Sequence, residues 1–268
     1  MAIQAMSTAC TGLSALSQDI DVTANNLANV NTVGFKGSRA NFEDLLYQHQ
    51  EIPGTLNSQN VTKPMGLSVG LGTRISGTQV LFSQGPAITT GRPLDIQIDG
   101  EGFFQVDTGA DVGGGVGYTR AGNLFTNRDG ELVLGNSSGV RLEPPITVPI
   151  DATSIDIGKD GKVSVLLPGS TTPQEVGQIQ LARFVNSAGL EQVGANIFLA
   201  TAASGDATVG NPGEQGLGPI SSGFLEGSNV EAVKELVSLI KTQRAFELNS
   251  QVITTSNEML QTITRLKQ

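Results

Sequence analysis

The chain begins with an amphipathic stretch, IQAMSTACTGLSALSQDIDVTANNLAN, over residues 3–29. Four of its apolar residues recur at intervals of seven: Met6, Leu13, Ile20 and Leu27. A companion series, three residues earlier in each heptad, consists of Ile3, Cys10, Ser17 and Ala24. Such a seam is typical of a helix that packs against other helices. The stretch therefore predicts one long helix, spanning roughly 40 Å at 1.5 Å per residue.

The last forty residues predict a second long helix. Neither Gly nor Pro occurs in residues 228–268, and Ser228 and Glu231 have the spacing of a capping box. An apolar stripe with steps mostly of three, four or seven contains Val233, Leu236, Ile240, Ala245, Leu248, Val252, Met259, Ile263 and Leu266. Since the region between the two helices is not strongly helical, we expect them to pack on each other or on further copies of the chain.

The middle of the chain, residues 67–225, predicts β-strands. Apolar and polar residues alternate over residues 94–99, which is the pattern of a half-buried strand. Asp-Gly pairs at residues 99–100, 129–130 and 160–161 are typical of tight hairpins. The expected fold class is α+β, in which terminal helices form a coiled-coil-like domain around a central all-β region resembling an antiparallel barrel or sandwich.

Three kinds of region follow from this pattern. We predict a terminal helical assembly domain (1–40 and 226–268), an extended arm with a β linker (41–93 and 190–225), and an outer β-domain (94–189). Within the arm, residues 47–66 are polar and bounded by prolines, with little apolar content. By itself such a segment would be disordered or extended, and it would become ordered only on another surface.

Composition excludes several functional classes. The net charge is −9, and since the ends are near neutral, the acidity lies in the middle of the chain. A basic footprint for nucleic acid is absent. A single cysteine excludes an intrachain disulfide, and no apolar run approaches the ~20 residues of a membrane span. The N-terminus lacks the basic region of a cleaved signal peptide, so export would need another route.

No catalytic constellation can be assembled from the sequence. His49 is the only histidine and lies in the polar arm, which disfavours a zinc site or a nucleophile–histidine pair. Cys10 falls on the helix seam, where a buried, inert thiol is expected. Asp95, Asp99 and Glu101 are better explained as a solvated strand face than as paired carboxylates. We therefore predict a protein that is not an enzyme and needs no cofactor or metal.

Asn25, Asn26 and Asn29 are the sharpest local signal. Asparagine is unfavourable inside a helix because its amide competes for backbone hydrogen bonds. Simple termination of the helix is one explanation. Bridging from these amides to neighbouring backbones in a tight helical assembly is the other, and the sequence leaves the two open.

Several motifs together resemble the bacterial flagellar rod and hook protein family. They are ANNLANVNTVGFK (24–36), GEGFFQV (100–106), YTRAG (118–122), GFLEGSNV (223–230) and QRAFELN (243–249). The resemblance covers nearly the whole chain. FEDLLYQ at residues 42–48 and the polar arm after it are similar to the distal rod members of the family.

The resemblance implies a structural subunit of the distal rod of the basal body. Such a subunit would polymerise into a helical tube that transmits torque from motor to hook, with paired terminal helices inside and the β-domain outside. The implied partners are further copies of the chain, proximal rod and hook proteins, the surrounding ring proteins and the flagellar export apparatus. Nucleic acid and membrane insertion are not implied. The location would be the basal body across the periplasm, reached without a cleaved signal peptide.

The residues expected to carry assembly come from both helices. They are Met6, Leu13, Ile20, Asn25, Asn26, Leu27, Asn29, Val233, Leu236, Ile240, Leu248, Val252, Met259 and Ile263. Three alternatives remain: another axial component (hook or proximal rod), a secreted β-domain that binds a ligand, and an enzyme that cleaves cell wall through Asp99 or Glu101.

Overall fold

The computed structural model describes residues 2–54, 64–109, 115–170 and 172–266. The chain divides into two compact units. The helical unit consists of Met1–Ala28, Ser38–Gln79 and Ala232–Gln268, and the β unit consists of Asn29–Gly37 and Val80–Glu231. Both units are therefore built from segments that lie far apart in the sequence.

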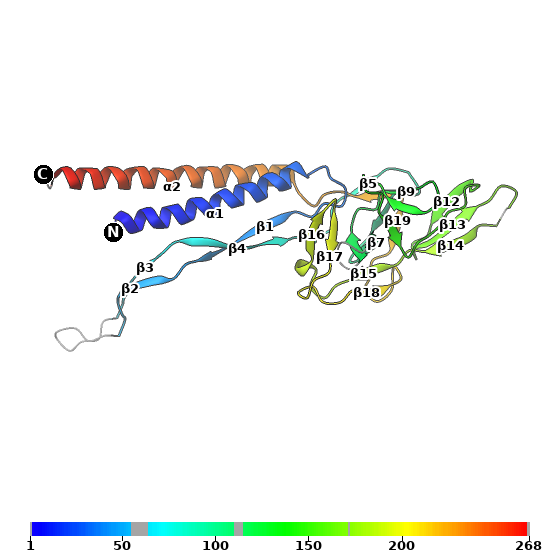
Figure 1. Ribbon diagram of the computed structural model, residues 1–268, viewed down its shortest axis with the longest axis horizontal. Coiled ribbons are helices and arrows are strands. Elements are labelled where there is room, and N and C mark those ends of the chain that lie inside the picture. The colour runs from blue at the N-terminus through cyan, green and yellow to red at the C-terminus, as the bar shows by residue number, and fades with distance from the viewer. Residues whose placement is uncertain (1, 55–63, 110–114, 171, 267–268) are drawn as a thin grey trace. The chain divides into compact units, whose positions relative to one another are not determined.

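Two long helices form the body of the helical unit. They are α1 (Ala2–Ala28) and α2 (Ala232–Leu266), which lie side by side (Figure 1). Both helices are predicted by the sequence and are confirmed. Before α2 begins, the Ser228 hydroxyl accepts a hydrogen bond from the Val230 amide at 3.2 Å, and the capping box of Ser228 and Glu231 stays a prediction.

A narrow β ribbon completes the helical unit. Its strands are β1 (Ser38–Asp44), β2 (Tyr47–Glu51), β3 (Leu67–Gly70) and β4 (Thr73–Val80), and they pair as β1–β4 and β2–β3. The predicted polar arm at residues 47–66 begins with β2, which is exposed at every residue. Residues 55–63 of that arm lie outside the described residues.

The β unit is built around one large antiparallel sheet, in which strands distant in the sequence lie side by side. Its main path runs β16 (Glu191–Gly194), β17 (Ile197–Leu199), β8 (Gly115–Thr119), β7 (Phe103–Gly109), β11 (Arg141–Glu143), β10 (Leu132–Leu134) and β9 (Leu124–Thr126). Beside this path, β15 (Leu181–Arg183) pairs with β7 and with β18 (Thr208–Gly210). A 3-10 turn, η1 (Ser187–Gly189), precedes β16.

Smaller antiparallel pairings complete the β unit. They are β12 (Ser154–Ile157) with β13 (Lys162–Leu166) and β14 (Gln174–Gln178), β6 (Ile96–Ile98) with β19 (Ile220–Ser222), and β5 (Ala87–Thr89) with β20 (Phe224–Glu226). The strands predicted for the middle of the chain are confirmed, so the protein is α+β with terminal helices flanking a mostly β region.

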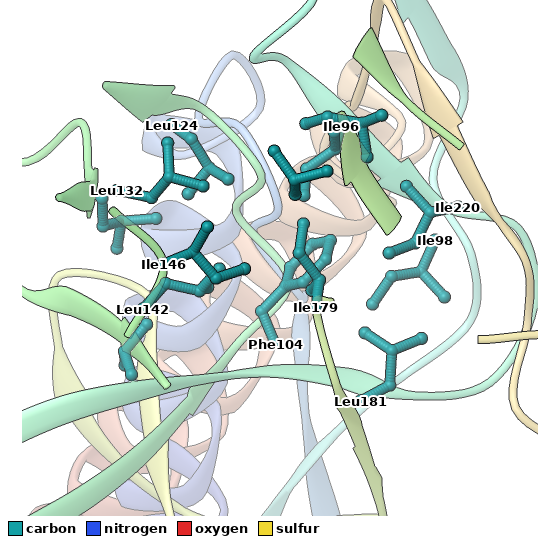
Figure 2. Close-up of a cluster of buried hydrophobic side chains, with 14 of the residues drawn as sticks. Ile96, Ile98, Phe104, Leu124, Leu132, Leu142, Ile146, Ile179, Leu181 and Ile220 are labelled. Atoms are coloured by element: carbon teal, nitrogen blue, oxygen red, sulfur yellow. The ribbon is translucent and has the colours of Figure 1, made fainter. Parts of the chain in front are cut away.

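Aliphatic side chains from many strands form the core of the β unit. Figure 2 shows Phe104 and Ile179 among the side chains of this cluster, with Leu132 and Ile220 also contributing to it. A second, aromatic cluster includes Phe103, which meets other rings edge-on. This apolar burial is the main stabilising contribution in the unit.

One strand is more deeply buried than its sequence pattern predicts. All of Ile96–Ile98 is buried, Gln97 included, although alternation predicted a half-buried strand. Asp95 is also buried and pairs with Arg92 at 3.5 Å, so it does not lie on a solvated face. Ile96 and Ile98 pack in the core and Gln97 on the opposite face is also buried, which local alternation cannot indicate.

Candidate functional site

The two helices contact each other through small and polar side chains. On α1, Gly12 lies so close to α2 that an added Cβ would come within 3.3 Å of the Asn249 side-chain amide. The Thr242 hydroxyl donates a hydrogen bond to the Asp19 carboxylate at 2.8 Å. Ala15 is also buried on α1. The contact is close at these positions because the residues are small.

The residues of α2 that are buried or half-buried form one face. From Leu239 onward they include Leu239, Thr242, Ala245, Asn249, Ile253, Ser256 and Leu260. Their steps of three and four residues are those of a single helix face. Since this face includes the contacts made with α1, it accounts for the intrachain packing of α2.

The predicted assembly residues of α2 are exposed, and at 100° per residue they are spread over about half of the helix circumference. These residues, with exposed fractions of 44–74%, are Val233, Leu236, Ile240, Leu248, Val252, Met259 and Ile263. Valine, leucine, isoleucine and methionine are usually inside folded proteins, so many exposed large apolar residues on one helix indicate an interaction surface. The single chain leaves this stripe uncovered.

The predicted stripe of α1 is partly covered. Met6, Leu13, Ile20 and Leu27 are half-buried, and they neither form the most buried face of α1 nor lie fully in solvent. The companion series is exposed at Ile3, Cys10, Ser17 and Ala24. The expectation of a buried thiol at Cys10 is therefore wrong, because the small residues Ala9, Gly12 and Ala15 take the closest contacts instead.

An apolar groove gathers part of the exposed stripe. Its volume is about 760 Å³, and α1, α2 and β3 all contribute to its walls. It is lined by Gln4, Ala5, Thr8, Ala9, Val69, Gly70, Asn249, Val252, Ser256, Met259 and Ile263. Val252, Met259 and Ile263 were predicted as assembly residues. The contributions from β3 were missed, since nothing in the sequence shows that this strand returns to the helices.

The three predicted asparagines have different roles. Asn26 is buried, and its side chain donates to the Ser38 carbonyl at 2.7 Å and accepts from the Ser38 amide at 2.9 Å. It thus bridges to a neighbouring backbone, that of β1 in the same chain. Asn29 is half-buried and accepts from the Thr32 hydroxyl at 3.1 Å, in the turn that follows α1. Asn25 is exposed.

A buried charge cluster joins three of the sequence motifs within the β unit. The Lys36 ammonium lies 2.5 Å from one oxygen of Glu226, and the Arg120 guanidinium lies 3.3 Å from the other. The Gly85 amide donates to the same carboxylate at 3.0 Å, and Lys36 also donates to the Ser83 carbonyl at 2.7 Å. The three charged side chains are almost completely buried, so each depends on the others for compensation.

Burial acts on both cations of this cluster. Loss of hydration lowers the pKa of the Lys36 ammonium, an effect partly opposed by the attraction and hydrogen bond of Glu226. Loss of hydration likewise lowers the pKa of the Arg120 guanidinium, against the pull of Glu226. The site therefore holds two dehydrated cations around one carboxylate. The contacts of both cations with Glu226 offset the free-energy cost of their lost hydration.

The backbone around the cluster is fixed by further long-range contacts. Gly34 has a φ of +69° and lies so close to strand β8's end that an added Cβ would come within 2.6 Å of the Ala121 amide. The Asn229 side chain accepts from the Gly37 amide at 2.8 Å and donates to the Leu81 carbonyl at 2.7 Å. Lys36, Arg120 and Glu226 all lie within the motifs of the sequence. Their meeting in one cluster could not be predicted, because it joins residues up to 190 positions apart.

Comparison with known proteins places the same segments in one family. A model for flagellar basal body rod proteins matches residues 6–36, a model for the D1 domain of flagellar hook proteins FlgE/F/G matches residues 97–165, and a model for the C-terminal region of rod proteins FlgEFG matches residues 221–266. The "flagellar basal-body rod protein FlgG" of Caulobacter vibrioides is 45% identical over 267 residues, which cover 99% of this chain and 100% of that protein.

Relatives from other bacteria agree. The proteins of the same name from Borreliella burgdorferi and Bacillus subtilis are 42% and 40% identical, over 99% and 96% of this chain and 99% and 96% of their own lengths. The chain belongs to the flagellar basal-body rod protein family.

The matched segments of this rod protein coincide with its distinctive geometry. The match at residues 6–36 spans most of α1 and ends at Lys36, and the match at 221–266 contains Glu226 and all of α2. Arg120 lies in the match at 97–165, so each of the three charged residues of the cluster falls within a different matched segment.

Neither a metal site nor a membrane-spanning helix occurs among the described residues. Within residues 2–54, 64–109, 115–170 and 172–266, no group of three or more His, Cys, Asp or Glu side chains is placed to hold a metal ion. No helix in the same part of the chain combines the length and apolarity needed to cross a membrane.

Proposed function

We propose that this rod protein is a structural subunit of the flagellar distal rod and polymerises into a helical tube that transmits torque from motor to hook. The observation that carries the proposal is the exposed apolar stripe of α2, which the chain's own α1 does not cover. Family membership supports it, because the relatives are named as rod proteins of the basal body.

The uncovered surfaces suggest how subunits join. We expect helices of neighbouring subunits to cover the α2 stripe and to enter the groove at Val252 and Met259. Contacts between different surfaces of identical subunits generate an open helical filament when the rotation does not close. Asn25 and the α1 residues Met6, Leu13, Ile20 and Leu27 would contribute from the other helix.

Finer features of the fold belong to the same proposal. The helix pair would extend into a coiled-coil-like inner domain (1–40 and 226–268), carrying an arm and β linker (41–93 and 190–225) and an outer β-domain of barrel or sandwich type (94–189). Close contact at Gly12 and the family resemblance support the first of these features. The intrachain contact leaves the apolar stripe of α2 exposed and so does not account for it.

Partners and location follow from this role. The proposed partners are further copies of the chain, proximal rod and hook proteins, the surrounding ring proteins and the export apparatus, without nucleic acid or membrane insertion. The subunit would act in the basal body across the periplasm after export without a cleaved signal peptide. It would have no enzymatic activity and no cofactor, since its role is mechanical.

Electron microscopy of concentrated protein tests the proposal. We expect tubes from the wild type and no tubes from Leu248→Glu, because the carboxylate would have to be desolvated in the subunit contact. Ser250→Glu is the matched control: it adds the same charge to the same helix, but two residues further on, about 200° around the axis. We expect Ser250→Glu to retain the tubes.

Limited proteolysis of the dilute monomer provides a second test. Helices with uncovered apolar residues are only marginally stable by themselves. We therefore expect the protease to trim both termini before it cuts the β unit. Termini that are fully protected in the dilute monomer, or tubes that form equally well with Leu248→Glu, would contradict assembly through these helices.

The polar arm gives a further test of the mechanical role. We propose that it lies along adjacent subunits and stiffens the rod, because added contacts oppose sliding. Deletion of residues 47–66 should yield filaments that bend more, measured as a shorter persistence length in micrographs. Filaments of unchanged stiffness would contradict this part of the proposal.

A further inference from the structure

Four exposed apolar side chains form a compact patch on the first turns of α2. Their positions, spaced i, i+3, i+4 and i+7, lie on one side of the helix. They are Val233, Leu236, Val237 and Ile240. Further along the helix, the same side is polar and carries Glu247, Gln251 and Glu258, which are all exposed. The patch at residues 233–240 is therefore a bounded apolar surface of about two helical turns.

The apolar groove of the helical unit lies further along the same helix. Its α2 wall includes Val252, Met259 and Ile263, and the first turns of α1 contribute to it together with Val69 and Gly70 of β3. Of the described residues that line the groove, none carries a charge. A charged group would lose its hydration here without compensation, so the groove fits an apolar occupant.

A chain cannot place its own patch in its own groove. Both surfaces belong to α2, in which their centres are about 20 residues and therefore roughly 30 Å apart. This single helix of 35 residues keeps that separation. The patch can therefore enter the groove only of another copy.

Charges beside the two surfaces are complementary. Lys234 and Lys241 are exposed on one side of the patch, about 100° around the helix from its centre, whereas Glu235 is half-buried and lies nearly opposite the patch. At the groove, β3 pairs with β2, and the exposed Glu51 carries the only formal charge of these two strands. The margin of the patch is thus positive and the ribbon beside the groove is negative, which favours their approach.

We propose that the patch of one copy docks in the groove of the next copy, so that identical chains are joined head to tail. This inference rests on the proposed polymerisation and names the two surfaces that meet. A helix with apolar anchors at i, i+3, i+4 and i+7 is a common occupant of an apolar groove. Because the patch and the groove are different surfaces, the contact does not close into a two-fold dimer and can repeat along a filament.

Disulfide crosslinking of the concentrated full-length protein tests the contact. The native thiol is first removed by Cys10→Ser, since Cys10 is exposed. Val237→Cys then places a thiol in the patch, and Val252→Cys places one in the groove. On oxidation, we expect a 1:1 mixture of the two variants to give a heterodimer. A chain that carries both changes should give a ladder of head-to-tail oligomers.

Thr254→Cys is the matched control for the groove position. It places a thiol on an exposed residue of the same helix, two positions after Val252 and so about 200° around the axis. Mixed with Val237→Cys, it should give about tenfold less disulfide, because the bond forms only where the two Cα atoms come within about 7 Å. Each variant alone should give as little, since a head-to-tail contact keeps like positions apart. All of these positions are exposed, so the substitutions leave the packing of the monomer intact.

The outcomes separate this contact from polymerisation in general. Crosslinks between Val237→Cys and Val252→Cys that exceed those of the controls support the docking. Tubes that form without this crosslink overturn the docking and leave polymerisation standing. A crosslink from Ile52→Cys, on the exposed ribbon, to Val252→Cys in its place would also overturn it, because the ribbon of a neighbouring copy would then fill the groove. If neither tubes nor crosslinks form, both the docking and the proposed polymerisation are wrong.

Discussion

Glu226 is the residue on which the buried charges of the β unit depend. Its two oxygens face Lys36 and Arg120, and the Gly85 amide adds a neutral hydrogen bond. All three charged side chains lose their hydration on folding, so the cluster stabilises the fold little more than apolar side chains in its place would. Removing one member, however, leaves an uncompensated buried charge. The cluster therefore holds three distant segments together, because separating its charges would cost much free energy.

Glu226→Gln should destabilise the β unit by about 3–5 kcal/mol, because it leaves two buried cations without their counter-charge. Chemical denaturation followed by far-ultraviolet circular dichroism measures the free energy of unfolding. Glu131→Gln is the matched control, since Glu131 pairs at 3.1 Å with the half-exposed Arg141 and should contribute less than about 1 kcal/mol. Equal losses from the two variants would show that burial of the cluster has no special weight.

Tyr118 makes stability depend on pH in the alkaline range. Burial, and then the negative charge of Glu143, raise the pKa of its phenol above the usual 10.0. The folded state consequently keeps its proton where the unfolded chain loses it, so the free energy of unfolding falls as pH rises above 10. We expect the free energy of unfolding of Tyr118→Phe, measured by calorimetry, to fall less steeply between pH 10 and 11 than that of the wild type. Parallel curves for the two proteins would contradict a raised pKa.

At the scale of elements, α2 carries two faces with different roles. One face, which includes Thr242 and Asn249, contacts α1, whereas the large apolar residues Leu248 and Ile263 are exposed. Asn26 connects α1 to β1 through two hydrogen bonds to the backbone of Ser38. Within the helical unit, this amide therefore sets where the ribbon begins relative to α1.

Asn26→Ala should free the start of β1. The change removes both hydrogen bonds to Ser38 and leaves a half-buried amide and carbonyl without the side-chain partner, at a cost of about 1–3 kcal/mol to the helical unit. Hydrogen exchange should report faster exchange at the Ser38 amide. Gln18→Ala, at an exposed position of the same helix, should leave that exchange rate unchanged, and a Ser38 amide that stays protected in Asn26→Ala would contradict the role assigned to Asn26.

At the scale of the whole molecule, the two units differ in what completes them. The β unit has a continuous apolar core of its own, including Ile179, Leu181 and Ile220, which are not exposed to solvent at all. The helical unit instead leaves a row of large apolar residues in solvent. Stability in such a molecule should be uneven, because burial of apolar surface is the dominant favourable contribution.

Hydrogen exchange across the whole chain should show this difference. In the dilute monomer we expect amides of α1 and α2 to exchange at least tenfold faster than those of β7 and β8. In assembled tubes, the amides of α2 should become protected, because neighbouring subunits would suppress local unfolding. Protection that is equal in the two units before assembly would contradict the division of stability proposed here.

Much of the architecture is predictable because it depends on local periodicity. The heptads of residues 3–29 and the uninterrupted stripe after Val233 identify both helices, and the Asp-Gly turns indicate a β middle. Periodicity could not distinguish which helix face meets which neighbour. Cys10 shows the difficulty: it lies in the heptad seam and is exposed, because Ala9, Gly12 and Ala15 permit a closer approach on another face.

By itself, the sequence determined the helix–strand–helix order, the exposed-stripe residues of α2 and the family, since these reside in residue spacing and contiguous motifs. Only the tertiary structure decided that the stripe stays uncovered, that Asn26 binds the backbone of Ser38, and that Lys36, Arg120 and Glu226 share one buried cluster. The physical reason is that burial and charge compensation depend on which distant segments meet in space. A one-dimensional pattern records the charges but not the distance between them.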